Sequence, residues 1–527
     1  INGHIYANQN ATAVAIERGV IRYIGKDEGA LAIADEDTEI IDLEGAFVLP
    51  GFIDNHNHLF EAGSVAAGQC ELSPDENLAG LAAYLADCAA QTSGEGWLMG
   101  HGFSLEGVLE SDSAQTPRQL LDAYFPTRPV ALLEQTSHAV WLNSAALQEM
   151  GWHNNTAPPQ GGWLLKSERG ELNGIVLDSA GDLVIERAWR ALPDLAAQNL
   201  QGLRDGLAEV ARHGITTVGD GRMYWRRGWL QSWLTLERSG ELSARVSLRP
   251  WIYPNIPMAE QLPVLRKMQR SNPHKLLLIN QAKLYSDGII GNTSAKLLRD
   301  YTFSYLPHSP RGLNYIAPTA LKTWLAELQR IGYGAHIHAI GDGAVRESLD
   351  AVAALPKRHS DTQYSLTHIE MLDNADTKRF FELDVSADFQ VGGAYIIAGD
   401  HSWARPFIGH RVSKLLPLGK LFRSGANITL SSDWDVNPLS PLAGIANSLR
   451  LGTHGLPDIH SAIAAYTINP ARSLGLADIT GSIALGKSAD FTLLDRDITA
   501  LPAAKISDAQ VLMTVLRGEI VYDSETD

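Results

Sequence analysis

The amino-acid sequence predicts an α/β protein: a (β/α)8 TIM-like barrel, joined to a small β-sandwich domain and interrupted by a large insertion after the first barrel strand. Two observations predict this fold. Short apolar runs of β character alternate with longer helical segments through the middle of the chain, whereas both chain ends are rich in strands. Alternating strands and helices are typical of a parallel sheet, and eight such units close into a barrel.

The two chain ends are expected to form one small domain. Residues 1–48 hold short alternating runs separated by turns, and a break follows at Pro50 and Gly51. Residues 476–527 have the same strand-rich character. Because termini commonly lie close together in compact proteins, we expect these two segments to build a composite β-sandwich, with residues 49–475 forming the barrel.

Eight runs between the two ends are candidate barrel strands, since each is short and apolar and most precede a helical pattern. They are residues 52–58, 216–220, 246–251, 279–288, 334–343, 364–370, 385–390 and 428–435. The active site of such a barrel lies at the C-terminal ends of its strands. Polar residues at the ends of these runs are therefore the first candidates for chemistry.

One long stretch, residues 60–205, separates the first two strands. It contains a helix start of the capping-box type at Ser73 to Glu76, a further β-like run and a hairpin rich in Gly and Trp. We expect an inserted subdomain over the barrel mouth, which is a natural position for substrate selection.

The charge balance narrows the classes of partner. The 527 residues include 43 Lys and Arg against 60 Asp and Glu, a formal charge of −17. This balance argues against a nucleic acid or an anionic membrane surface. No apolar run reaches the roughly 18 to 20 residues that span a bilayer. We expect a small-molecule substrate and no membrane insertion, and a homodimer is compatible with the sequence.

The two cysteines, Cys70 and Cys88, fit neither a CxxC redox pair nor a zinc knuckle, and two are too few for a disulfide-dense secreted scaffold. Cys88 lies in a helical pattern and is expected to be a buried helix residue. The chain begins at Ile1, within an apparent strand and without an initiator Met. A cytoplasmic location is the expectation, and an exported form with a removed leader stays open.

A pair of histidines ends the first predicted strand. Side chains alternate along a strand, so His56 and His58 face the same side about 7 Å apart. The pair alone is a weak signal, but His338, His368 and Asp433 each end a separate later strand. Strand ends converge in a barrel, and these side chains together are a complete set of nitrogen and oxygen ligands for zinc or a similar ion.

Two further residues have competing interpretations. His336 shares a face with His338 but lies one step deeper, so a hydrogen-bonded core histidine or a partner of a ligand is favoured. Lys283 sits in an apolar strand, where an unpaired ammonium is costly. It either extends its amine toward solvent or pairs with Asp287, or it brings to the metal cluster a neutral amine or a carbamate formed with CO2.

A series of motifs follows in order along nearly the whole chain: LPGFIDNHNHL, SHAVWLNSAAL, HGITTVGDG, KLYSDGIIGNTSA, HIHAIGDGAV, SLTHIEML, LSSDWDVNPLSPLAGI and AAYTINPARSLGLADITGSIALGKSADFTLLD. In this series the chain resembles the metal-dependent amidohydrolase superfamily. Within it the chain is similar to the amidohydrolase-3 group, which includes N-substituted formamide deformylase-like proteins and an exoenzyme regulatory protein. The resemblance is specific for fold and family, and much less so for substrate.

The resemblance implies a set of metal ligands, each matched to a motif: His56, His58, Lys283, His338, His368 and Asp433. In this group the fourth-strand lysine is usually carboxylated and bridges two metals, and the eighth-strand aspartate also acts as base toward the hydrolytic water. It therefore implies one or two zinc ions, an N-carboxylated Lys283, and catalytic roles for Asp433, Lys283 and His338.

The chain departs from the group's pattern beside the ligands. Asn55 and Asn57 stand where small or apolar residues are more common, and Thr367 stands where relatives often have Glu. These departures bear on substrate preference rather than on metal binding. The candidate substrate contacts are His101, His138, Arg222, Tyr285 and Trp434.

The leading hypothesis is a metal-dependent hydrolase that cleaves a C–N bond other than a peptide bond, in an N-formyl, N-acyl or cyclic amide. The second is a hydrolytic deaminase of a heterocycle, although such deaminases typically hold one metal and lack the bridging lysine. The third is a regulatory or binding protein that has lost catalysis. The complete ligand set argues against the third, since a retired site would be expected to lose ligands.

Overall fold

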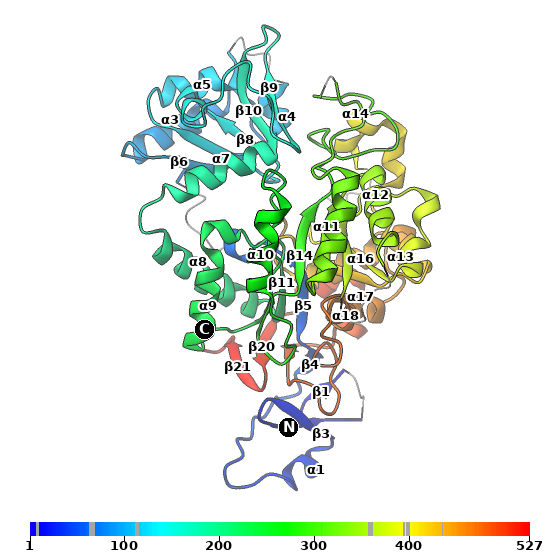
Figure 1. Cartoon of the computed structure of the whole chain (residues 1–527). Coiled ribbons are helices and arrows are strands. Elements are labelled where there is room, and N and C mark those ends of the chain that lie inside the picture. Colours follow the sequence, from blue (N-terminus) through cyan, green and yellow to red (C-terminus); the bar gives the residue numbers. More distant parts are fainter. Residues whose placement is uncertain are drawn as a thin grey trace.

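The computed structural model describes residues 1–6, 10–62, 69–110, 115–306, 308–356, 362–393, 396, 401–434 and 436–526 (Figure 1). Asp435, which ends the eighth predicted strand, lies outside the described residues. In Figure 1 the inserted segment (cyan) lies at the upper left, strands surrounded by helices occupy the centre, and strands from both chain ends lie at the bottom.

The candidate barrel strands are all present, and every pairing among them is parallel. They form two sheets, with orders β13–β12–β11–β5 and β14–β15–β16–β17–β18. The strands are β5 (Phe52–Asn57), β11 (Ile215–Asp220), β12 (Arg245–Ser247), β13 (Leu277–Leu278), β14 (Gln281–Tyr285), β15 (Gly334–Ala339), β16 (Tyr364–His368), β17 (Val385–Gln390) and β18 (Ile428–Ser431). Of the fourth predicted run, residues 279–288, only β14 is a strand. The short strand β13 precedes it, and Ile279 between the two exchanges both backbone hydrogen bonds with Arg270.

Backbone hydrogen bonds also connect the two parallel sheets. Lys283 of β14 donates to the carbonyl of Pro250 and accepts from Ile252, both at 3.0 Å, just beyond the end of β12. On the other side, the N–H of Asp433 donates to the carbonyl of His56 in β5 at 2.8 Å. The observed architecture is a TIM-barrel-like α/β fold.

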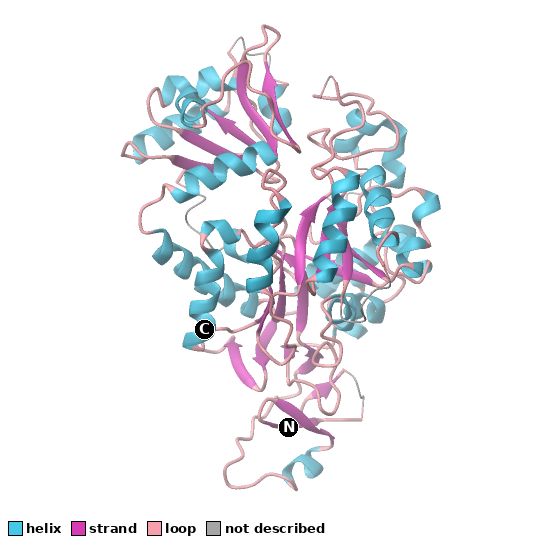
Figure 2. Cartoon of the chain, in the orientation of Figure 1, coloured by secondary structure: helices cyan, strands magenta, loops and turns pink. Residues whose placement is uncertain are grey.

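Helices cover the outside of the parallel strands (Figure 2). They are α8 (Leu195–Arg212), α9 (Trp229–Ser239), α10 (Met258–Met268), α11 (Pro318–Arg330), α12 (Asp342–Ala353), α13 (Arg379–Glu382), α14 (Arg405–Ile408), α15 (Leu418–Arg423), α16 (Pro441–Arg450), α17 (Ile459–Ala465) and α18 (Ile468–Ser473). In α11, a proline opens the first turn, and Leu321, Trp324, Leu325 and Leu328 recur at helical spacing and are buried. Among the described residues, no helix is both long and apolar enough to cross a membrane.

The segment between β5 and β11 contains a mixed five-stranded sheet of its own, with order β6–β7–β8–β10–β9. The strands are β6 (Leu98–Phe103), β7 (Val130–Glu134), β8 (Ala139–Leu142), β9 (Gly162–Lys166) and β10 (Leu172–Asp178). The helices of this segment are α2 (Leu59–Ala62), α3 (Leu81–Gln91), α4 (Leu105–Leu109), α5 (Pro117–Tyr124), α6 (Ser144–Glu149) and α7 (Ser179–Arg190). The segment has its own apolar core, in which Trp141 is fully buried.

The helix start expected at Ser73 is wrong. Residues 73–76 form a turn, and α3 begins only at Leu81. The reason is local hydrogen bonding: the side-chain oxygen of Asn77 accepts from the N–H groups of Ala79 and Gly80, which holds this stretch in a turn. A complete capping box occurs instead at Thr116, which opens α5.

The two cysteines form a disulfide that the sequence did not reveal. Cys88 is the buried helix residue expected, in α3, but its sulfur is bonded to Cys70 across 18 positions. Cys70 lies beside β6, because its carbonyl accepts from the N–H of His101. The bond therefore ties α3 to the edge of the inserted sheet. Such bonds are rare in reducing compartments, so the disulfide does not favour the cytoplasmic expectation.

Strands from both chain ends pair in one sheet, with order β1–β4–β19–β20–β21. They are β1 (His4–Ile5), β4 (Phe47–Pro50), β19 (Phe491–Leu494), β20 (Val511–Leu516) and β21 (Glu519–Asp523). A hairpin of β2 (Ala13–Glu17) and β3 (Val20–Gly25) lies beside this sheet, with the short helix α1 (Asp27–Leu31) after it. Side chains from both ends share an apolar cluster, including Ile5, Ile21, Val48 and Phe491.

Candidate metal centre and active-site cavity

The two first-strand histidines approach one carboxylate oxygen. His56 lies in β5, which is buried along its whole length, and His58 follows directly after it. The Nε2 atom of His56 lies 3.1 Å from Oδ1 of Asp433, and Nε2 of His58 lies 2.9 Å from the same oxygen. Imidazole nitrogens and a carboxylate are typical zinc ligands.

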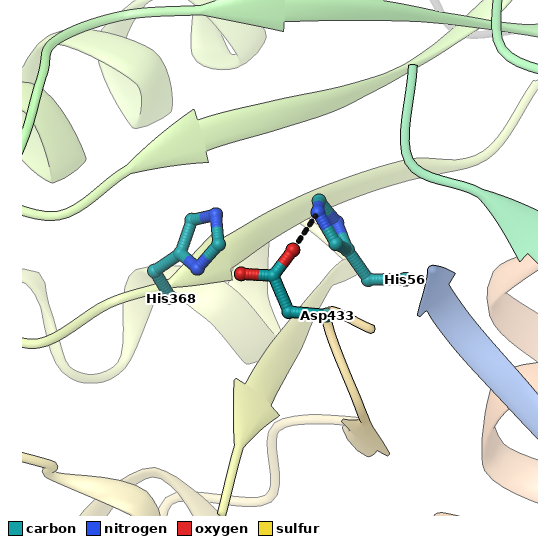
Figure 3. A group of neighbouring side chains, drawn as sticks. All are labelled: His56, His368 and Asp433. Carbon is teal, nitrogen blue, oxygen red and sulfur yellow. Dashed lines mark ion pairs between the residues drawn. The ribbon is translucent and has the colours of Figure 1, made fainter. Parts of the chain in front are cut away.

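His368 reaches the same point from the end of β16 (Figure 3). Its ligand atom and those of His56 and Asp433 lie within 4.8 Å of one another. Both His368 and Asp433 have positive φ angles, 76° and 56°. Such angles cost free energy in residues with a side chain, and they concentrate at functional sites. In Figure 3 both side chains point into the cluster.

His338 of β15 joins the group from the next strand. Its ring lies 4.4 Å from that of His368 and stacks on Tyr285 at 4.1 Å. Its Nε2 atom lies 3.1 Å from the carbonyl oxygen of Gly288. A carbonyl only accepts, so Nε2 carries the proton and Nδ1 keeps its lone pair. Nδ1 is buried and has no hydrogen-bond partner among the described residues, which suits a metal ligand.

Lys283 is fully buried in β14 and its amine points to the cluster. The Nζ atom lies 3.3 Å from Nδ1 of His56. Asp287, the alternative partner, instead accepts hydrogen bonds from three backbone N–H groups. Burial lowers the pKa of Lys283 well below its usual value. The environment therefore favours a neutral amine at this position.

His336 contacts His56 from a position deeper in the barrel, in agreement with the sequence interpretation. Its Nε2 lies 2.6 Å from Nδ1 of His56, and its own Nδ1 lies 2.6 Å from the hydroxyl of Ser365. His56, His336 and Asp388 are a second group with ligand atoms within 4.8 Å. The carboxylate of Asp388, however, accepts hydrogen bonds from the side chains of Asn55, Thr367, Thr429, Ser431 and Gln390. We therefore interpret the second group as a hydrogen-bonded network.

The protonation states of three of the histidines and of Asp433 suit metal binding. Burial lowers the pKa of His56 and His338 well below the usual value, and lowers that of His368 to about 3. Burial alone would raise the pKa of Asp433, but His56 and His58 outweigh it and hold that pKa well below its usual range. Neutral imidazoles and an ionised carboxylate are the forms that bind a metal ion.

His58 is held from its other side by Glu61, a residue that was not singled out in the sequence, together with Arg222. Its Nδ1 lies 3.1 Å from Glu61 of α2. Glu61 also accepts two hydrogen bonds from the guanidinium of Arg222, at 3.1 and 3.2 Å. Burial would raise the pKa of Glu61, but Arg222 and His58 outweigh it and lower that pKa to about 2. An ionised carboxylate therefore orients the His58 ring. At His58, burial and Arg222 act to lower the pKa, but the carboxylates of Asp433 and Glu61 outweigh them and raise it.

His138 brings the inserted segment to the metal residues. Its Nδ1 lies 2.8 Å from Oδ1 of Asp178, and its ring lies 5.2 Å from that of His338. Asp178 ends β10 with a φ of 52°. A Cβ atom at Gly288 would lie 2.8 Å from both carboxylate oxygens of Asp178. The glycine therefore leaves room for the His138–Asp178 pair.

Of the other candidate substrate contacts, Arg222, Tyr285 and Trp434 lie next to the cluster, whereas His101 does not join it. Arg222 donates to the hydroxyl of Tyr285 at 3.0 Å, and both residues are buried. The carbonyl of Trp434 accepts from the N–H of His58 at 2.7 Å, and His101 lies on β6 in the insert. Of the five candidates, only His138 is among the described residues that line the active-site cavity.

The cluster opens into a cavity of about 690 Å³, which lies between the strand ends and the insert. His138, His338, His368 and Asp433 are part of its wall. Several polar residues of the wall were not singled out in the sequence, among them Glu134, Asn292 and Glu370. Glu134 and Glu370 stand at or just after the end of a strand. This position could have marked both residues as site candidates in the sequence.

Comparison with known proteins identifies the family. A model of the amidohydrolase family matches residues 39–522. YtcJ of Bacillus subtilis (strain 168) is 28% identical over 97% of this chain and 96% of its own length. N-substituted formamide deformylase of Arthrobacter pascens is 25% identical, over 98% and 96% respectively. The solved structure of an uncharacterized metal-dependent hydrolase from Pyrococcus horikoshii OT3 aligns with a TM-score of 0.73 at 23% identity, covering 96% of this chain and 98% of that one.

The family match spans the strands that carry the cluster, the insert and most of the sheet formed by the two chain ends. It agrees with the resemblance carried by the motifs and with the chemistry of the converging side chains. The chain therefore belongs to the amidohydrolase family, and it is a metal-dependent hydrolase that acts on carbon–nitrogen bonds other than peptide bonds.

Proposed function

We propose that the protein hydrolyses an N-formyl or N-acyl amide, or a cyclic amide, at the cluster beside the cavity. The observation that carries this proposal is one oxygen of Asp433 held between the Nε2 atoms of His56 and His58. The similarity to an N-substituted formamide deformylase supports the N-formyl class.

The proposal includes a closed (β/α)8 barrel over residues 49–475, with residues 60–205 as an insertion. The hydrogen bonds between the two parallel sheets support closure. Residues 1–48 and 476–527 are proposed to form the composite β-sandwich, and the pairing of β4 with β19 supports their association.

The residues proposed to hold one or two zinc ions are His56, His58, Lys283, His338, His368 and Asp433. The unpaired Nδ1 of His338 and the lowered pKa values of His56, His338 and His368 support this set. When bound, a divalent ion supplies Lewis acidity, which acidifies water and polarises an amide carbonyl. Lys283 is proposed to be N-carboxylated, and its depressed pKa supports the neutral amine that reacts with CO2.

Asp433 is proposed to move the proton. Its carboxylate takes a proton from the attacking water and passes it to the nitrogen of the leaving amine. His56 and His58 hold that carboxylate ionised and oriented, while Glu61 fixes the His58 ring from behind. His338 and Lys283 are proposed to bind the ion on the side where the amide carbonyl would be polarised. His338 also lines the cavity.

The proposal is tested with metal-loaded protein and a panel of N-formyl amines, N-acyl amines and cyclic imides. We expect turnover of at least one class. We also expect Asp433→Asn to lower kcat/KM by about 10²- to 10⁴-fold, the range typical of a general acid–base group. Asp205→Asn, at an exposed carboxylate, is the control and should keep the wild-type rate. An unchanged rate in Asp433→Asn would overturn the mechanism.

Metal counting separates this proposal from hydrolytic deamination of a heterocycle. About two metal equivalents with a modified Lys283, seen by intact mass spectrometry, support amide hydrolysis. One equivalent with a free lysine, together with ammonia release from a heterocyclic amine, supports deamination. Complete ligation without turnover of any substrate class supports a regulatory or binding protein.

A further inference from the structure

The charged residues of the cavity wall are all of one sign. The acidic side chains in the described part of the wall are Asp75, Glu106, Glu134, Glu370 and Asp433, and this part contains no lysine or arginine. An anionic group on a ligand would therefore meet repulsion outside the metal centre, whereas a cationic group would meet attraction.

Two groups in this wall are buried and lack a partner. Oε2 of Glu370 and Nδ2 of Asn292 have no hydrogen-bond partner among the described residues, and Asn292 is only 2% exposed. A buried polar atom left unpaired costs free energy that a ligand recovers by bonding to it. The carboxyl oxygen of Glu370 is available to accept from a donor on the ligand, and the amide nitrogen of Asn292 is available to donate to an acceptor.

Glu134 adds a second carboxylate from the insert side of the cavity. It ends β7 and is 4% exposed. Its Oε2 atom accepts from both the backbone N–H and the hydroxyl of Thr136, which fixes the side chain. The insert side of the cavity therefore contributes a buried acidic residue, and the barrel side contributes Glu370, whose Oε2 atom is buried.

Part of the wall is apolar. It includes Ile289, Ile290, Ile340, Phe407 and Leu415, and all but Ile289 are fully buried members of one cluster. Apolar walls with a few oriented polar groups are typical of small-molecule sites. A ligand that fits has an apolar body, one donor and one acceptor.

We propose that the substrate is an amide with an apolar body that carries a protonated amine away from the scissile bond. Glu370, assisted by Glu134, binds the amine, and the amide nitrogen of Asn292 donates to an acceptor on the same molecule. Amides that carry a carboxylate, such as N-acyl amino acids, are rejected by the acidic wall. This inference rests on the proposed amide hydrolysis and names its substrate class.

The test uses three N-formyl benzylamines that differ only at the para position: aminomethyl, methyl or carboxylate. The affinities of the three corresponding non-hydrolysable ureas are measured by calorimetry on metal-loaded protein. This readout does not depend on turnover. We expect the aminomethyl urea to bind at least about tenfold tighter than the methyl urea, with the carboxylate urea weakest. Equal or tighter binding of the carboxylate urea would overturn the inference.

A variant series locates the selectivity. Glu370→Gln should reduce the aminomethyl-to-methyl affinity ratio by about tenfold, while Glu149→Gln, at an exposed glutamate on the outside of the insert, should keep the wild-type ratio. A wild-type ratio in both Glu370→Gln and Glu134→Gln would overturn the assignment. Selective binding of the aminomethyl urea without hydrolysis of any formamide would contradict the proposed function while leaving the inferred selectivity intact.

Discussion

The two sides of the cavity are built in different ways. On the barrel side, the proposed ligands stand at the ends of β5, β14, β15, β16 and β18, where strand register places them together. On the insert side, His138 and Glu134 lie in or beside turns between antiparallel strands, and Asp178 lies at the end of β10. From this difference we infer that the regular strands are suited to supply the chemistry, and that the irregular connections are suited to contact the rest of the proposed substrate.

The largest expected effect follows from removing a barrel-side ligand. His368→Ala should lower kcat/KM by more than about 100-fold, beyond the loss typical of an outer partner of a ligand, and should lower metal content. Activity assays and metal analysis by mass spectrometry measure both effects. His213→Ala, at a partly exposed histidine in the C-cap of α8, serves as the control. Full metal content and activity in His368→Ala would remove this residue from the ligand set.

The disulfide offers a change confined to the insert. The Cys70→Ser/Cys88→Ser double variant should lose about 3 kcal/mol of stability, the chain-entropy value for a loop of this size. The insert has its own apolar core, so we expect it to unfold before the barrel. Urea unfolding and limited proteolysis with and without reductant measure the effect. Identical unfolding curves for wild type and variant would show that the bond contributes little to the insert.

A substitution at Glu61 tests whether metal binding on the barrel side depends on the carboxylate beside His58. Glu61→Gln keeps the size of the side chain but removes the charge beside His58 and Arg222. We expect metal affinity to fall by about 10- to 100-fold, the range typical of such outer partners. Competition with a chelator measures the affinity. Glu241→Gln removes a carboxylate from an exposed arginine pair and should keep the wild-type affinity. A wild-type affinity in Glu61→Gln would contradict the positioning role.

The smallest effect is expected on the insert side. Asp178→Asn should misorient His138 and lower kcat/KM by about tenfold or less, without changing metal content. Steady-state kinetics with parallel metal analysis separates the two sides of the cavity. Loss of metal in this variant would show that the insert also builds the metal centre.

The barrel side of the cavity was largely predictable because side-chain directions alternate regularly along a strand. Alternation along a strand places His56 and His58 on one face, and the ends of parallel strands meet. Periodicity also gave His336 its deeper position, which its contacts with His56 and Ser365 bear out. For Lys283, however, the residues alone left two interpretations open, and the family resemblance was needed to favour one of them.

The insert and the outer partners were less predictable because tertiary contacts fix them. Glu61 and Arg222 are 161 positions apart, and only the folded chain shows that they meet. The pairing of Cys70 with Cys88 depends on where α3 packs, which no local pattern reveals. At Ser73 the sequence has a capping-box pattern, but no helix begins there because the Asn77 side chain holds the next residues in a turn.

The position of a bound metal ion tests directly whether Asp433, His56 and His58 form the metal centre. Among the residues that the structure describes, two groups of side chains are close enough to hold an ion, and they share His56. Anomalous diffraction at the zinc edge from metal-loaded crystals should place an ion against Asp433, His56 and His58. An ion against Asp388 and His336 instead, or no ion at either position in the loaded protein, would contradict the account.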